Sequence, residues 1–297
     1  MSNPIGELAA LLTAVCWTYN SIAFSRAGRR VGSVTVNHVR LWVALAALLP
    51  IHWLAHGTLL ASGLGWRATA WLALSGIVGY VVGDAFLFEA FVLIGARLSM
   101  LLMLLAPIFG SILAWMFLGE HLRPLEITAI LIAVSGIAMV IASTRSSDMS
   151  PRRHFRLGIL LGVGGAFGQA GGLLLSKLGM VAGASPIAAN QVRVVAAVAV
   201  LTPFFLLRGR LGTDIAKMRD RRALADITTG AMVGPVLGVI LSLVAIRHSH
   251  IGVASTLMSL SPVLLLPISR YLFREQVTWP AVAGTVVALS GAAILFF

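Results

Sequence analysis

Three long stretches of the sequence contain no charged side chain. Residues 98–119, 227–246 and 276–297 hold no Asp, Glu, Lys or Arg. A helix of about 20 apolar residues is long enough to cross a bilayer. Lipid offers no hydrogen-bond partner to an open strand edge, so stretches of this kind fold as helices in a membrane. The sequence therefore predicts an all-α integral membrane protein.

Composition extends this prediction to the whole chain. Charged residues make up 11% of the 297 residues and hydrophobic residues 59%, whereas a soluble domain carries about 25% charged residues. Ten segments are long and apolar enough to span a bilayer. They are residues 5–25, 34–56, 67–91, 97–118, 124–143, 157–177, 186–207, 224–246, 252–273 and 278–297.

The basic residues lie in short clusters between the apolar segments. The net charge of +12 is therefore typical of membrane-protein loops, and we expect no nucleic-acid partner. The loops after every odd-numbered segment hold about 15 Lys and Arg residues, and the opposite face holds about four. Cytoplasmic loops are the positive ones, so this asymmetry predicts that both termini lie outside the cell.

The chain repeats itself at an offset of about 155 residues. "NHVRLWVALAALLP" at 37–50 matches "NQVRVVAAVAVLTP" at 190–203, and "GYVVG" at 79–83 matches "GPVLG" at 234–238. The match keeps its register through several segments, so we divide the chain into two homologous halves. The predicted units are a first five-helix repeat (1–145), a basic linker (146–156) and a second five-helix repeat (157–297).

An odd number of helices per half has a topological consequence. If the first half begins on one side of the membrane, the second begins on the other, and the two become inverted repeats. Secondary transporters have this architecture, with the substrate site near the bilayer midplane between the repeats. We expect ten transmembrane helices, as two inverted five-helix repeats around a central cavity.

A third repeated pattern is the most specific. A proline is followed thirteen positions later by a glutamate in each half, at Pro107 and Glu120 and at Pro262 and Glu275. The other marks are Trp17 and Asn20 in the first segment, and Arg40 and Arg193 near the starts of the second and seventh.

With these marks the sequence resembles the drug/metabolite transporter superfamily in its ten-helix EamA-type branch. Within that branch it resembles amino-acid exporters of the YddG type. The resemblance implies that helices 1, 3, 4, 6, 8 and 9 surround a central cavity and that helices 5 and 10 pack behind them.

Asp84 is the most informative single residue. It lies past the middle of the third apolar segment, where an ionised carboxylate is costly unless it faces water or a partner. One hypothesis makes Asp84 a site for a substrate ammonium or a coupling proton. The other makes it a structural carboxylate held by Arg40 or Arg193. Its counterpart in the second half is Val239, so the repeat itself does not require an acid, and this favours the functional hypothesis.

Further residues are candidates for contact with a substrate. Tyr80 lies one helical turn before Asp84, and a proline inside a helix frees a backbone carbonyl that can line a polar site. The predicted substrate-binding residues are Trp17, Asn20, Tyr80, Asp84, Met103, Pro107, Gln169, Met258 and Pro262. We assign structural roles to Arg40, Arg193, Glu120 and Glu275.

The sequence favours a transporter over other classes. No phosphate-binding loop, catalytic triad or metal-ligand spacing is present, so we expect no enzyme activity, no cofactor and no metal. The central hypothesis is a secondary transporter of the bacterial inner membrane, which exports small amphipathic metabolites, above all amino acids, by alternating access. An exporter of cationic drugs and an intramembrane or lipid-modifying enzyme are the alternatives. We expect a monomer whose partners are its substrate and membrane lipid, because ten helices can enclose a whole cavity.

Overall fold

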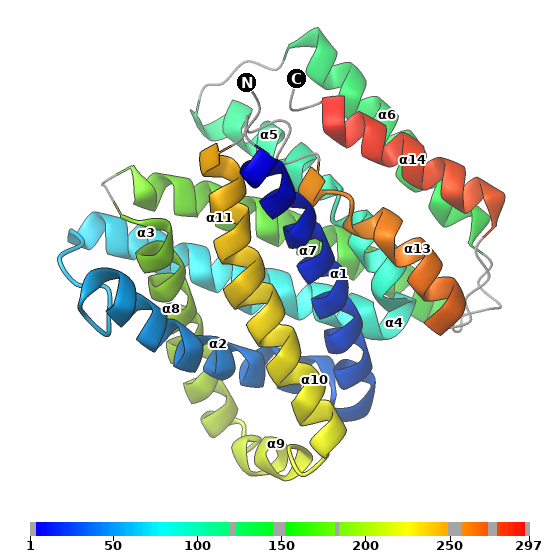
Figure 1. Ribbon diagram of the computed structural model, residues 1–297. Coiled ribbons are helices and arrows are strands. Elements are labelled where there is room, and N and C mark those ends of the chain that lie inside the picture. Colours follow the sequence, from blue (N-terminus) through cyan, green and yellow to red (C-terminus); the bar gives the residue numbers. More distant parts are fainter. Residues whose placement is uncertain are drawn as a thin grey trace.

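The computed structural model describes residues 4–118, 123–144, 152–181, 184–248, 257–272 and 278–294. Within these ranges all the regular structure is helical (Figure 1). The elements are α1 (Pro4–Val31), α2 (Ser33–His56), α3 (Trp66–Gly76), η1 (Ile77–Gly83), α4 (Asp84–Leu102), α5 (Leu105–Leu118), α6 (Pro124–Ser143), α7 (Arg152–Met180), α8 (Pro186–Leu207), α9 (Leu211–Lys217), α10 (Arg221–Ala231), η2 (Met232–Gly238), α11 (Val239–His248), α13 (Ser261–Leu272) and α14 (Trp279–Ile294).

The described residues include seven helices that are long and apolar enough to cross a membrane. They are α1, α2, the continuous run Trp66–Leu102, α6, α7, α8 and the run Arg221–Ser242. Two shorter apolar helices correspond to α5 and α14. The chain is thus a multi-pass membrane protein. The count of ten spans stays a prediction, because much of the expected segment 252–273 lies outside the described residues.

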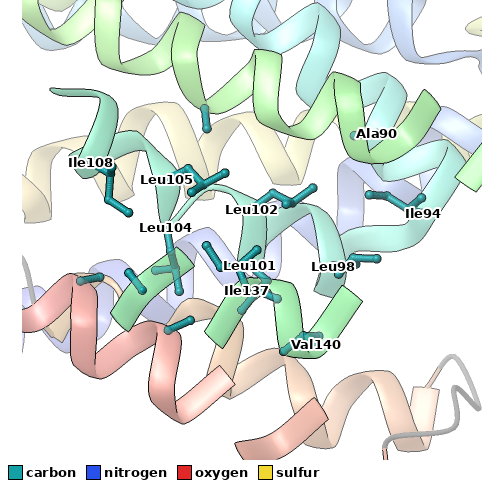
Figure 2. Packing of buried hydrophobic residues seen from close by; sticks show 14 of the residues in the cluster. Ala90, Ile94, Leu98, Leu101, Leu102, Leu104, Leu105, Ile108, Ile137 and Val140 are labelled. Atoms are coloured by element: carbon teal, nitrogen blue, oxygen red, sulfur yellow. The ribbon is translucent and has the colours of Figure 1, made fainter. Parts of the chain in front are cut away.

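The third and fourth expected segments are separated at a glycine. Gly95 has φ 79° and ψ 164° inside the run that ends at Leu102, a backbone conformation that side chains with a Cβ rarely adopt. A second break follows at residues 103–104, before α5. Pro107 has no N–H to donate to the carbonyl of Met103, so the α-helical hydrogen-bond pattern is interrupted there. Figure 2 shows buried leucines on both sides of this second break, packed against Ile137 and Val140 of α6.

The helices α6 and α14 run side by side at one edge of the molecule (Figure 1). A Cβ at Gly136 of α6 would collide with the backbone of Ala288, and a Cβ at Gly291 of α14 would collide with the backbone of Ala133. Small residues let membrane helices approach closely. The two contacts are reciprocal: each glycine meets the alanine that lies three residues before the other glycine.

Two helices contain a π-helical segment at matched positions. The segment η1 joins α3 to α4, and η2 joins α10 to α11, so their starts, Ile77 and Met232, lie 155 residues apart. In η2, Pro235 cannot donate a backbone hydrogen bond, which disfavours the α-helical pattern. Such π-helical turns inside α-helices are frequent at functional sites. Neither segment was predicted from the sequence.

Each π-helical segment packs against a helix from the other half of the sequence. The helix α7 contacts α3, η1 and α4, and α1 contacts α10, η2 and α11. At the first interface the helices meet glycine on glycine: a Cβ at Gly83 would lie 3.1 Å from the carbonyl carbon of Gly168.

The helix α7 begins at Arg152, so residues 152–156, expected in the linker, belong to this helix.

Candidate functional site

A buried cluster of charged and polar side chains lies where η1 meets α2, α7 and α8. We call it the Asp84 cluster and define it as Asn37, Arg40, Tyr80, Asp84, Gln169, Asn190 and Arg193. It joins side chains from four helical runs that are far apart in the sequence.

Asp84 is the acid of this cluster, and it is almost fully buried at 4% exposure. Its carboxylate forms an ion pair with the Nη2 of Arg40. The side-chain amide of Gln169 on α7 donates a second hydrogen bond to the carboxylate, with an Nε2–Oδ1 distance of 2.6 Å. Asp84 opens α4 directly after η1, so the π-helical segment determines which way this carboxylate points.

Arg40 is fully engaged. Besides Asp84, its Nε and Nη2 donate to Oδ1 of Asn37, one turn earlier on α2, at 3.1 and 2.9 Å. The guanidinium carbon lies 4.7 Å from the centroid of the Phe88 ring and 5.9 Å from that of Phe24. A guanidinium over an aromatic face is stabilised by the ring quadrupole, more strongly where water is excluded.

Tyr80 lies at the centre of the cluster. Its backbone carbonyl, within η1, accepts a hydrogen bond from Nδ2 of Asn37 at 3.0 Å. Its hydroxyl donates to Oδ1 of Asn190 on α8 at 2.5 Å. The guanidinium carbons of Arg193 and Arg40 lie 4.4 and 5.7 Å from the centroid of its ring. The repeated pairs Asn37/Asn190 and Arg40/Arg193 thus converge on one tyrosine.

A second group of predicted residues surrounds α1. The side chain of Asn20 occupies the space that a Cβ at Gly234 of η2 would take, and Trp17 lies against Gly238 in the same way. Met258 is buried and packs with alanines of α1 and α11, and Trp17 packs against that group. This group is apolar apart from Asn20, so it is suited to contact with the apolar part of a ligand.

The remaining predicted residues lie at the helix breaks. Met103 is half-buried between two apolar clusters, and Pro107 is half-buried in α5. Pro262 is buried at the start of α13 and lacks the N–H that would reach the backbone carbonyl of Met258 in an α-helix. The hydroxyl of Ser261 donates to the backbone carbonyl of Ala14 on α1 at 3.0 Å and lies 3.4 Å from that of Met258. Glu120 and Glu275 lie outside the described residues.

The structure brings five predicted residues into one cluster: Tyr80, Asp84, Gln169, Arg40 and Arg193. It places Trp17, Asn20 and Met258 around α1 and η2. Phe24, further along α1, reaches the Asp84 cluster, because its ring centroid lies 5.9 Å from the guanidinium carbon of Arg40. Sequence reasoning missed Asn37 and Asn190 as members of the site. The identity of these asparagines in both repeats was the available signal. No pattern pointed to Phe24 or Phe88.

A further polar cluster connects α9 to the membrane helices. Asp214 is 4% exposed and accepts a hydrogen bond from the hydroxyl of Thr35 on α2 at 2.7 Å, and Lys217 donates to the same hydroxyl at 3.3 Å. Nδ1 of His38 lies 3.8 Å from Oδ2 of Asp214, and its ring stacks on Phe205 of α8. This arrangement anchors the loop helix to α2 and α8. In the part of the chain that the structure describes, this cluster included, no group of three His, Cys, Asp or Glu side chains could hold a metal ion.

The sequence profile of the EamA-like transporter family matches residues 4–142 and again residues 156–297. The chain belongs to the EamA-like transporter family. Members of this family transport small solutes across membranes and are not enzymes. This EamA-like chain accordingly has a small-molecule substrate and a lipid environment.

Structural comparison agrees with the family. One solved crystal structure aligns with 97% of this EamA-like chain and 94% of its own, with a TM-score of 0.64 and 17% sequence identity. At that identity the similarity shows a shared fold and nothing finer. No curated protein matches the sequence significantly. The cargo of this EamA-like transporter must therefore be argued from its own residues.

Proposed function

We propose that the chain is a secondary transporter that exports small amphipathic metabolites, above all amino acids, across the bacterial inner membrane. The Asp84 cluster carries this proposal. Ionisable side chains inside membrane-spanning segments are costly and mark substrate or ion pathways by default. Here Asp84 lies beside a π-helical segment, which is itself a common feature of functional sites.

Alternating access between two inverted five-helix halves, residues 1–145 and 157–297 around a linker at 146–156, is the proposed mechanism. Three observations support it. The family profile matches the chain twice, the π-helical segments lie at equivalent positions, and the contacts between α6 and α14 are reciprocal. Reciprocal contacts are what a two-fold relation between equivalent surfaces produces. Transporters of this architecture rock one repeat against the other around a central site.

The cargo would lie between the two groups of residues. Asp84, Tyr80 and Gln169 would bind its polar head, while Trp17 and Met258 would contact its apolar part. Pro107 and Pro262 would contribute the breaks in their helices and not free carbonyls, because the carbonyls of Met103 and Met258 already accept other hydrogen bonds. Amino acids of the kind that YddG-type exporters carry combine both chemical characters. An exporter of cationic drugs is the second candidate, favoured by the buried carboxylate alone.

The remaining features of the proposal concern the setting and the energy source. The excess of Lys and Arg in the loops after odd-numbered segments supports an orientation with both termini outside the cell. A single chain of this length supplies both halves, so the unit is a monomer. Asp84 could carry a coupling proton, or the protein could be a facilitator that uses the substrate gradient alone. The transport assay below distinguishes these two.

Uptake of labelled amino acids into proteoliposomes tests the proposal. Wild type is compared with Asp84→Asn, with and without a pH gradient, and Asp226→Asn is the matched control. Asp226 pairs with Arg26 near the helix end at 2.7 Å, an exposed pair of the kind that contributes little. Uptake that depends on the gradient and disappears only in Asp84→Asn indicates proton coupling. Uptake that ignores the gradient indicates a facilitator. No uptake of any amino acid by folded protein contradicts the amino-acid proposal.

A further inference from the structure

The Asp84 cluster contains more positive than negative charge. Arg40 and Arg193 are 4% and 9% exposed, and Asp84 is the acid between them. A guanidinium stays protonated in proteins, so the cluster carries a charge of +1 when Asp84 is ionised and +2 when it is protonated. An uncompensated buried cation is costly. The resting cluster therefore lacks one anion.

The two arginines hold equivalent places in the repeats but have unequal partners. The Nε of Arg40 donates to Oδ1 of Asn37 at 3.1 Å. The Nε of Arg193 is buried and has no hydrogen-bond partner among the described residues. Asn190 precedes Arg193 as Asn37 precedes Arg40, but its Oδ1 accepts the Tyr80 hydroxyl instead. Arg193 has thus lost the neighbour that would satisfy it.

The acid is also missing on the Arg193 side. The position in the second half that corresponds to Asp84 is Val239. The repeat therefore supplies two guanidinium groups and only one carboxylate. A structural role alone would be served better by an apolar residue, because a buried N–H donor without an acceptor, here the Nε of Arg193, destabilises the fold.

The in-plane Nε–H donor of Arg193 is left without an acceptor among the described residues. The face of the guanidinium lies over the ring of Tyr80, with 4.4 Å from the guanidinium carbon to the ring centroid. Stacking of this kind uses the face of the group and not its in-plane N–H donors. Beside Nη2 lies Gly79, where an added Cβ would come to 3.3 Å from the nitrogen, so the bare glycine lets this edge of the guanidinium pack closely against η1. The in-plane fork of a guanidinium matches the two oxygens of a carboxylate.

We propose that Arg193 binds a carboxylate of the cargo and that the substrates are small molecules bearing a carboxylate. This inference rests on the transport function proposed above and narrows it. The carboxylate would supply the anion that the cluster lacks and the acceptor that Nε of Arg193 lacks. A zwitterion would satisfy both ends of the site, because its ammonium would pair with Asp84, which follows Tyr80 on the same helical run. A cation without a carboxylate would meet a net positive site.

Ligand-dependent thermal stabilisation of the purified full chain tests the inference. The probes are the twenty L-α-amino acids and, for each, the α-amino amide, which keeps the ammonium and the side chain and lacks the carboxylate. Arg193→Gln is compared with Arg208→Gln. Arg208 follows the last residue of the same helix and also lies over an aromatic ring, that of Phe204 at 5.1 Å. We expect acids but not amides to stabilise wild type and Arg208→Gln, and Arg193→Gln to bind acids at least about tenfold more weakly.

A second measurement needs no ligand. Removal of an unsatisfied charge should leave Arg193→Gln unfolding at the wild-type temperature or above it, whereas Arg40→Gln should unfold at a lower temperature because it deprives Asp84 of its partner. A large drop for Arg193→Gln, or failure to fold, shows a structural arginine and overturns the inference.

The outcomes also separate the inference from the proposed function. If amides bind as well as acids, or if Arg193→Gln keeps the wild-type affinity for acids, the carboxylate assignment is wrong while transport of amphipathic amines stands. If neither set of probes binds and proteoliposomes accumulate none of them, both the inference and the proposed amino-acid transport are wrong.

Discussion

The ion pair between Arg40 and Asp84 makes a quantitative prediction about stability. Both side chains are buried, and removal of one member of a buried pair costs about 3–5 kcal/mol because the other charge stays behind. Asp84→Ala should lie at the upper end of this range, since the guanidinium cannot give up its proton. Arg40→Met should lie at the lower end, because the carboxyl can become protonated and keeps the hydrogen bond from Gln169.

The double variant isolates the interaction itself. With both charges gone no unpaired member of the pair remains, so the cost should be about 2–3 kcal/mol below the sum of the two single variants. The assay is reversible unfolding in mixed detergent micelles, followed by circular dichroism. The exposed pair Arg26–Asp226 is the control cycle, with an expected interaction energy below about 1 kcal/mol. Additivity within about 0.5 kcal/mol for Arg40 and Asp84 would refute the reasoning.

Two further predictions concern other parts of the molecule. Gly136→Val and Gly291→Val should each lower the free energy of unfolding by about 3 kcal/mol, because the added side chain meets helix backbone that cannot move aside. Gly110→Val is the control in the same unfolding assay, because a Cβ there meets nothing within 4 Å. Equal losses at all three positions would contradict this packing. The hydrogen bond from Arg30 holds the pKa of Asp220 below its ordinary value of 3.8, so the stabilising contribution of Asp220 is present above about pH 4 and is lost as the pH falls through the folded-state pKa. Asp220→Asn should therefore lower the unfolding temperature at pH 7 and converge with wild type near pH 2; a difference that persists there would show another cause.

Hydropathy was sufficient to predict the helical membrane architecture, because burial in lipid requires long apolar segments. It could not predict η1 and η2, since a π-helical turn depends on the helix that packs against it. At η1 that helix is α7, which meets Gly83 with Gly168. The short helix α9 was also missed, because its seven residues carry too few periodic positions to stand out.

The charged residues of the Asp84 cluster could be predicted from the sequence, but the ion pair that they form could not. Asp84 was visible as an acid in an apolar run, and the repeat marked Arg40 and Arg193. The sequence left open which arginine pairs with the acid, because both candidates follow the same pattern, Asn-x-Val-Arg, in the repeats. The structure resolves this choice through Asn37 and Asn190, whose side chains bind different atoms of Tyr80.

The most direct test of the account is whether the Asp84 cluster meets water from each side of the membrane in turn. Gln169→Cys, in a Cys16→Ser background, places a thiol against the Asp84 carboxylate. Leu160→Cys is the control, because Leu160 is 68% exposed and lies on the opposite face of α7 from Gln169. We predict that a membrane-impermeant maleimide labels position 169 from either side, that a transported amino acid protects it, and that position 160 stays unlabelled. If position 169 is labelled from neither side in folded protein, the cluster lies off the transport pathway and the central claim is wrong.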